Sequence, residues 1–404
     1  MLESRAANII SGVLKRPLLG GIASITVSHF LIETFVENLS SVLIPVFMRE
    51  YKLDWLAVGI VVVIPQACKA LGTIPCMTLS EKVKHNHLTF LSLALSSVAA
   101  ISMIIAQDIY LAVLLLSLMH FSLALYHPPS YSMVSELSGA QRTKAMGMLG
   151  AAGTLGWASG LISFGLLTSI LNWRFVYVLW GIPTLLGAFP ILQLKTAPPR
   201  REDEPGHSRA GSIIGNIRKV LTITFALFIF TRGLSLVATK AVSMFLPSYL
   251  NMTKGMTIQV ASLVLGIMPL IGVASEFSGG FVAARFGIKR CLTTFYALES
   301  SALLAILLSP SPVLLILFSL IYSSAGSVMN AAWTSVVAQL TPSRLRGTGY
   351  SFYFMPFNIT GPISPMIGTI LVQNLGLEWI FIWSMTMFVI TAALLQSIPM
   401  KKNQ

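Results

Sequence analysis

Long apolar runs separated by short polar segments make up most of the chain. Each run has about twenty residues or more, enough for an α-helix to cross a hydrocarbon core about 30 Å thick. The pattern therefore predicts an all-α integral membrane protein with twelve transmembrane helices. The first six runs lie at 20–47, 55–80, 88–107, 109–137, 145–170 and 174–194, and the second six at 218–249, 257–284, 287–308, 313–340, 346–375 and 378–398.

One polar segment, 195–217, separates the two sets of runs. It contains the stretch KTAPPRREDEPGHSRAGS, whose charge, proline and glycine are typical of a solvated linker. The flanking halves align at an offset of about 202 residues, which pairs Pro45 with Pro247 and Gly147 with Gly349. We expect two pseudo-symmetric six-helix bundles, over 1–194 and 218–404, joined by a cytoplasmic linker.

Composition and charge placement support this interpretation. Of 404 residues, 55% are hydrophobic and only 10% are charged, which excludes an ordinary soluble enzyme. The net charge of +13 comes from bases concentrated in alternate loops. Their distribution predicts a multi-pass protein of the cell membrane with both termini cytoplasmic, in contact with anionic lipid and without a nucleic-acid partner. The opposite loops hold only four bases, Arg49, Lys52, Arg174 and Lys254.

Motifs that are typical of nucleotide-binding proteins and metalloproteases are absent from the sequence. It has no phosphate-binding Gly-x-x-x-x-Gly-Lys-Ser/Thr loop, no His-Glu-x-x-His and no Gly-x-Gly-x-x-Gly after a strand. We therefore expect no enzymatic activity, no cofactor and no resident metal. The basic start of the chain leads directly into the first run, so no cleavable signal peptide is expected.

Two loop motifs carry a family resemblance. GGFVAARFGIKR (279–290) and PSRLRGTGYSF (342–352) resemble loops of the major facilitator superfamily, although Ala284 stands where the family has Asp. The resemblance implies a transporter whose halves rock about a central cavity lined by helices 1, 4, 7 and 10. It also implies gating roles for charges in these loops and in their first-half counterparts, namely Glu81, Lys82, Arg142, Arg285 and Arg344.

A narrower resemblance involves helices 1 and 4. SHFLIETF (28–35) and ALYHPPSYSMVSELSG (124–139) are similar to segments of the fosmidomycin-resistance branch of drug exporters. Glu33 takes the place of that branch's helix-1 Asp, and Pro129 stands where the branch has an acid.

Helix 1 holds the main candidates for proton coupling. His29, Glu33 and Glu37 follow at four-residue steps, which would align them on one helical face. Two carboxylates one turn apart repel each other, so one would tend to hold a proton. The alternative is that one acid forms an ion pair with a base on another helix.

Helix 4 offers a second polar stripe. His120, His127 and Tyr131 return to nearly one direction on the helical wheel; His127 is assigned to proton coupling, and His120 and Tyr131 to substrate binding. Packing of either histidine in the core is the alternative. Pro128 and Pro129 remove backbone donors, which predicts an irregular turn here.

Helices 7 and 10 supply the expected substrate contacts. Arg232 and Lys240 would form an electropositive site for an anion, or would pair with Glu33 or Glu37 across the halves. Asn330 and Trp333 would complete the site, with core packing as the alternative. Glu299, in the ninth run, has no role in this scheme.

The expected function is secondary active transport by a monomer. Proton-coupled export of a small anionic or amphiphilic compound is the first hypothesis. Proton-coupled uptake of an organic acid or sugar phosphate is the second, and a non-transporting membrane receptor is the third.

Overall fold

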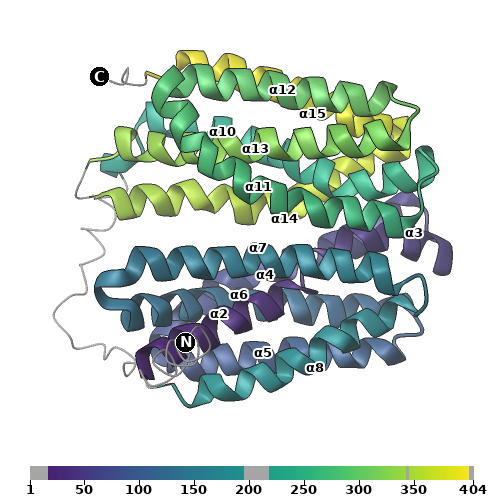
Figure 1. Ribbon diagram of the computed structural model, residues 1–404, viewed down its shortest axis with the longest axis vertical. Helices are drawn as coiled ribbons and strands as arrows, with labels where there is room; N and C mark the ends of the chain where they lie inside the picture. The colour runs from purple at the N-terminus through teal and green to yellow at the C-terminus, as the bar shows by residue number, and fades with distance from the viewer. Residues whose placement is uncertain (1–16, 195–217, 343–344, 400–404) are drawn as a thin grey trace, which may run out of the picture. The chain divides into compact units, whose positions relative to one another are not determined.

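The structure is a computed structural model that describes residues 17–194, 218–342 and 345–399, almost all of them helical (Figure 1). The helices in the first half of the sequence are α2 (Pro17–Glu33), α3 (Leu39–Glu50), α4 (Trp55–Lys82), α5 (His85–Ser102), α6 (Ile109–Ser138), α7 (Arg142–Leu167) and α8 (Trp173–Leu192). Those in the second half are α10 (Ile223–Ser248), α11 (Ile258–Phe286), α12 (Ile288–Leu308), α13 (Pro312–Leu340), α14 (Arg346–Leu375) and α15 (Glu378–Ser397).

Membrane-spanning length and apolarity are met by 10 segments of the described chain. The two other predicted runs are α14, a continuous helix that contains Pro356, Pro362 and Pro365, and the first run, which is divided between α2 and α3. Side chains facing away from the protein are apolar: along α8, Ile182, Leu186 and Phe189 recur at three- to four-residue steps and are exposed. Such a stripe on a spanning helix is suited to lipid.

The first predicted run is not one continuous helix. The backbone leaves the α-helix after Glu33 and resumes it at Leu39. The Asn38 side chain satisfies part of the interrupted backbone and ties it to α7, since its Nδ2 donates to the carbonyl of Thr34 at 3.1 Å and to that of Trp157 at 2.8 Å. Apolarity is uninterrupted here, so hydropathy could not locate the break. The prediction that Glu37 continues the helical face of His29 and Glu33 is therefore wrong.

The irregular turn predicted in the fourth run is also wrong. Helix α6 continues through Pro128 and Pro129 to Ser138. Proline costs a helix one hydrogen bond and crowds the preceding turn, but neither effect ends the helix here.

Polar residues define several helix ends. Asp108, Asn172, Thr222 and Thr257 each cap a helix by accepting a hydrogen bond from a backbone N–H of the first turn. These caps satisfy donors that the helix itself leaves free. Between α11 and α12, Gly287 has a φ of 84°, a conformation that favours glycine.

The described helices form two compact units. The first includes the described parts of Met1–Leu39 and Pro65–Arg201; the second includes those of Ser40–Ile64 and Glu202–Gln404. In the first unit, α2 packs against α6, α7 and α8, and α5 packs against α6 and α8. In the second, α13 packs against α11 and α12, while α10 packs against α14 and α15. The predicted linker, 195–217, lies outside the described residues, so the bundle boundaries stay a prediction.

Candidate functional site

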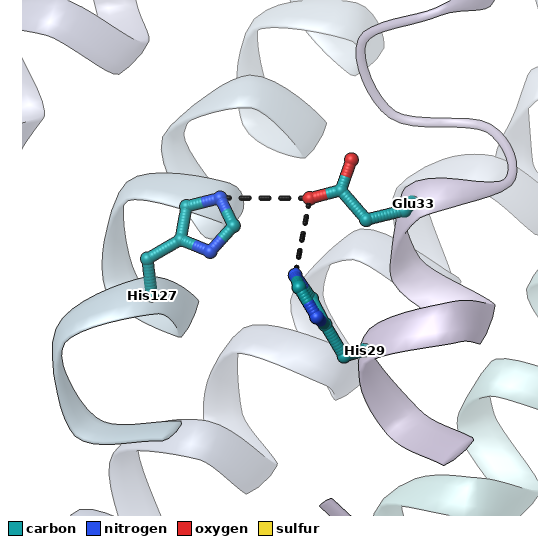
Figure 2. A group of neighbouring side chains, drawn as sticks. All are labelled: His29, Glu33 and His127. Carbon is teal, nitrogen blue, oxygen red and sulfur yellow. Dashed lines mark ion pairs between the residues drawn. The ribbon is translucent and has the colours of Figure 1, made fainter. Parts of the chain in front are cut away.

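Three titratable side chains meet between α2 and α6 in the first unit. Glu33 Oε1 lies 3.5 Å from His29 Nε2 and 3.5 Å from His127 Nε2 (Figure 2). We call these three residues the His–Glu–His cluster. The side chains of His29 and Glu33 are only 5% and 11% exposed, whereas that of His127 is 32% exposed. The cluster is therefore largely buried, with His127 on its accessible side.

The protonation of His29 is restricted by its second ring nitrogen. His29 Nδ1 lies 2.8 Å from the carbonyl oxygen of Leu149 on α7. A carbonyl only accepts hydrogen bonds, so Nδ1 carries a hydrogen. A neutral His29 would then direct the Nε2 lone pair at Glu33, and a carboxylate offers only further lone pairs. The contact is favourable when His29 or Glu33 holds one additional proton.

His127 completes the cluster from α6. Its Nδ1 is buried and has no hydrogen-bond partner among the described residues, while its Nε2 faces Glu33. A neutral His127 therefore places its hydrogen best on Nε2, where it can be donated to the carboxylate. Tyr131 lies beside both imidazoles, with its ring centroid 6.0 Å from those of His29 and His127, and is 41% exposed.

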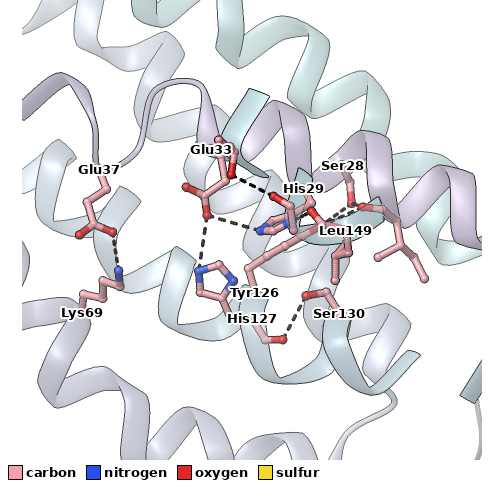
Figure 3. A network of polar contacts seen from close by, with 12 residues as sticks. Ser28, His29, Glu33, Glu37, Lys69, Tyr126, His127, Ser130 and Leu149 are labelled. Atoms are coloured by element: carbon pink, nitrogen blue, oxygen red, sulfur yellow. Dashed lines mark hydrogen bonds and ion pairs between the residues drawn. The ribbon is translucent and has the colours of Figure 1, made fainter. Parts of the chain in front are cut away.

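A hydrogen-bonded tyrosine packs against the cluster (Figure 3). Tyr126 is fully buried, and its ring stacks against His29 with centroids 5.7 Å apart. Its hydroxyl lies 2.8 Å from Ser28 Oγ and donates to the carbonyl of Ile25 at 3.2 Å. Sequence reasoning did not select Tyr126, although the pairs Ser28–His29 and Tyr126–His127 were visible as neighbours in the two segments quoted above.

The cluster also has the donor set of a transition-metal site. One ligand atom from each of the three residues lies within 4.8 Å of the others. Two imidazoles and a carboxylate suit zinc and related ions. Both imidazoles, however, already contact the same Glu33 oxygen without a metal: His127 through its Nε2 hydrogen, and His29 through the proton that it shares with Glu33. Functional tests of the cluster therefore need a chelator control.

Glu37 belongs to a different contact. Beyond the break in the first run, its Oε2 lies 2.5 Å from Nζ of Lys69 on α4 (Figure 3). The two side chains are 9% and 19% exposed. The pairing of one helix-1 acid with a base on another helix was the alternative that the sequence left open.

A second cluster, in the second unit, is centred on Arg232 of α10. Its guanidinium carbon lies 5.1 Å from the ring centroid of Trp333 and 5.4 Å from that of Phe357. Nη1 donates to Ser235 Oγ and Nη2 to Asn330 Oδ1, both at a long 3.4 Å. Its Nε is buried without a hydrogen-bond partner, and no carboxylate of the described chain lies within ion-pair distance. A buried guanidinium with only two long hydrogen bonds retains N–H groups that can bind an anion.

Only some of the other predicted substrate residues lie in the Arg232 cluster. Asn330 and Trp333 join the Arg232 cluster, and the Trp333 indole N–H donates to Tyr296 Oη at 3.1 Å. His120 is completely buried, with Nδ1 bonded to the carbonyl of Leu116 on its own helix. Lys240 is partly buried on α10. The structure therefore does not present His120 beside Tyr131 on an accessible face, and the substrate roles stay predictions.

The predicted gating charges lie at helix ends. Lys82 ends α4, Arg142 begins α7 and Arg285 lies in the last turn of α11, and all three are exposed. Arg344 and the side chain of Glu81 lie outside the described residues. Gating by these residues stays a prediction.

Comparison with known proteins identifies the family. The model of the Major Facilitator Superfamily matches residues 25–298 and 228–403. The chain belongs to this superfamily. It is therefore a multi-pass membrane protein and a secondary transporter, and the predicted all-helical membrane fold and absence of enzymatic activity are confirmed. A crystal structure of a bacterial homologue of the human lysosomal transporter Spinster, 17% identical, superposes with a TM-score of 0.77 over 94% of this chain and 96% of that one.

Curated relatives of this facilitator are distant. A Na⁺, Li⁺, K⁺/H⁺ antiporter of Planococcus maritimus is 29% identical over 28% of this chain and 28% of its own length. A probable sugar efflux transporter of Helicobacter acinonychis (strain Sheeba) is 25% identical over 44% of this chain and 45% of its own. The chain thus spans less than half the length of these two relatives.

Proposed function

We propose that this facilitator exports a small anionic or amphiphilic compound in exchange for protons, with the His–Glu–His cluster as the proton-binding site. The observation that carries the proposal is the hydrogen bond from His29 Nδ1 to Leu149, because it leaves one proton to be shared between His29 Nε2 and Glu33. Segments 28–35 and 124–139, which contain the cluster, resemble the fosmidomycin-resistance branch of drug exporters, and this resemblance favours export. Two distant relatives are named for antiport and efflux.

Proton exchange is assigned to Glu33 in preference to Glu37. Both acids are candidates, but Glu37 contacts a lysine, whose positive charge at neutral pH stabilises the carboxylate. Glu33 contacts only imidazoles among the described ion pairs, and histidine changes charge within the physiological range. His127, the more exposed imidazole, provides the route by which a proton reaches Glu33.

The driving force is sufficient for concentrative transport. An inward proton gains about 2.3 kcal/mol per 100 mV of membrane potential and about 1.4 kcal/mol per pH unit. A potential of about 100 mV and a difference of about one pH unit together provide about 3.7 kcal/mol, so one proton exchanged for one substrate molecule could sustain a gradient of roughly five-hundredfold.

The Arg232 cluster is assigned to the substrate anion. Its guanidinium provides charge, and Trp333 and Phe357 provide apolar faces. This combination suits a compound with one negative group and an apolar body.

The cell membrane with both termini cytoplasmic is the proposed location, since it places the positively charged loops inside.

The test uses purified protein in proteoliposomes, with substrates found by thermal stabilisation over a compound library. Inverted membrane vesicles that are energised should accumulate an exported compound, and collapse of the proton gradient should release it. Glu33→Gln should abolish this gradient-driven accumulation, and a chelator should leave the wild-type rate unchanged. Unchanged gradient-driven flux in Glu33→Gln would refute the proton site. Flux in the opposite direction would favour the second hypothesis, uptake of an organic acid or sugar phosphate, and absence of flux would favour a receptor.

A further inference from the structure

A buried carboxyl in the second unit is not used by the proposed mechanism. Glu299 lies on α12 and is only 1% exposed. Its Oε2 is buried without a hydrogen-bond partner, and no ion pair involves it within the described parts of the chain. A carboxylate in such surroundings is strongly disfavoured, whereas the neutral acid is tolerated.

The packing around Glu299 accommodates the carboxyl group. A Cβ on Gly326 of α13 would lie 2.7 Å from Glu299 Oε1, so the absence of a side chain at 326 leaves the space that this oxygen fills. The Tyr322 hydroxyl, one turn earlier on α13, is also buried and has no hydrogen-bond partner of normal geometry. The carboxyl therefore lies in a formed space beside polar groups, and is not directed at lipid.

One cation influences this carboxyl. Arg232 of α10 and Tyr322 of α13 both lie within electrostatic range of Glu299. On its own helix, Tyr296 accepts a hydrogen bond from Trp333, the residue that stacks on Arg232. From α15, Phe388 stacks on Tyr296, and the described acid of α11, Glu276, lies near Asn330.

We propose that Glu299 is a second proton-binding site of the protein, neutral at rest, and that it sets the net charge of the Arg232 cluster. When Glu299 holds its proton, the positive charge of Arg232 is uncompensated and available to an anion. When Glu299 loses the proton, its negative charge offsets the positive charge of Arg232, to which α12 is linked through Tyr296 and Trp333. The inference concerns protonation of the second unit and does not depend on proton exchange at Glu33.

The experiment is an infrared titration of the purified full-length protein. The spectrum of Glu299→Gln, subtracted from that of the wild type, isolates the Glu299 carboxyl without requiring a reagent to reach it. Gln has nearly the same shape as the protonated acid, so the variant should fold with unchanged thermal stability. We expect a protonated carboxyl band at pH 7 that disappears reversibly as pH rises. A carboxylate band at pH 7, or a protonated band that persists until the protein unfolds, would overturn the proposal.

Arg232 provides the second arm. In Arg232→Gln the protonated Glu299 band should persist to higher pH, because the cation that favours the carboxylate is gone. An unchanged titration would refute the link between Glu299 and Arg232. Glu33→Gln serves as the control: it should leave the Glu299 band unchanged, whatever it does to transport. A failure of the His–Glu–His proposal is thereby distinguishable from a failure at Glu299.

Discussion

Gly153 of α7 and His29 of α2 approach so closely that a methyl group at 153 would lie 2.8 Å from His29 Cε1. The imidazole occupies the space that a side chain would fill. The sequence showed only glycines at three- to four-residue steps, a pattern that indicates close helix packing without saying against what. The structure divides this row, since Gly153 adjoins His29, whereas an added Cβ at Gly147 or Gly150 would have no atom of the described residues within 4 Å.

The first prediction uses this difference within one helix. Gly153→Ala should push the His29 ring away from Glu33 and reduce gradient-driven transport at least about tenfold, because a displacement of about 1 Å is enough to disrupt a positioned group. Gly150→Ala, on the preceding turn, should have wild-type transport. The measurement is substrate flux in proteoliposomes under an imposed pH gradient, with protein amount and thermal stability matched. Equal rates in the two variants would contradict the positioning of His29 by Gly153.

The second prediction concerns the Glu37–Lys69 pair. Glu37→Gln leaves Lys69 without its ion-pair partner in a largely buried position and should lower the free energy of unfolding by about 3 kcal/mol. Adding Lys69→Met removes the remaining charge and should restore most of that loss. Denaturant unfolding in detergent of both single variants and the double variant gives the coupling energy. Additive losses would show that the two side chains do not stabilise each other.

The same double variant separates stability from coupling. It should still transport in response to a proton gradient, because exchange is assigned to Glu33. A stable double variant whose flux ignores the gradient would return Glu37 to the proton pathway.

The sequence predicted all three residues of the proposed proton site, together with Glu37, which lies outside the His–Glu–His cluster. Residues four positions apart share one face of any α-helix, and in the structure His29 and Glu33 are in contact. The next step, to Glu37, failed because α2 ends at Glu33. Within the break, Asn38 bonds to Trp157, a residue 119 positions away, and no local sequence pattern predicts such a contact.

Tertiary contacts explain the other failures. The tautomer of His29 is set by a backbone carbonyl on another helix, and every residue has such a carbonyl, so Leu149 has no distinguishing signal in the sequence. Helix α6 continues through Pro128 and Pro129, as it can when tertiary packing overrides local helix propensity. The apolar runs were predictable because burial in lipid requires about twenty apolar residues wherever the chain crosses.

The third prediction concerns pH. His127→Leu removes a donor to Glu33, so the carboxylate is less stabilised and the proton is released only at higher pH. The pH optimum of gradient-driven flux should rise by about one unit, the equivalent of about 1.4 kcal/mol. His127→Gln keeps an N–H donor and should shift less. His120→Gln, on the same helix but outside the cluster, should not shift the optimum. A His127→Leu optimum at or below the wild-type value would have the wrong sign.

The fourth prediction concerns the anion site. Arg232→Gln should weaken binding of the anion identified by thermal stabilisation about thirtyfold, the equivalent of about 2 kcal/mol for a charge-assisted hydrogen bond. Arg232→Lys keeps the charge but loses the planar group that lies over Trp333 and Phe357, so it should recover only part of the affinity. Equilibrium binding to purified protein measures both. Arg218→Gln, which removes one exposed positive charge just before α10, controls for net charge and should bind normally. Full affinity in Arg232→Gln would place the anion elsewhere, and equal losses in Arg232→Gln and Arg218→Gln would reduce the effect to long-range electrostatics.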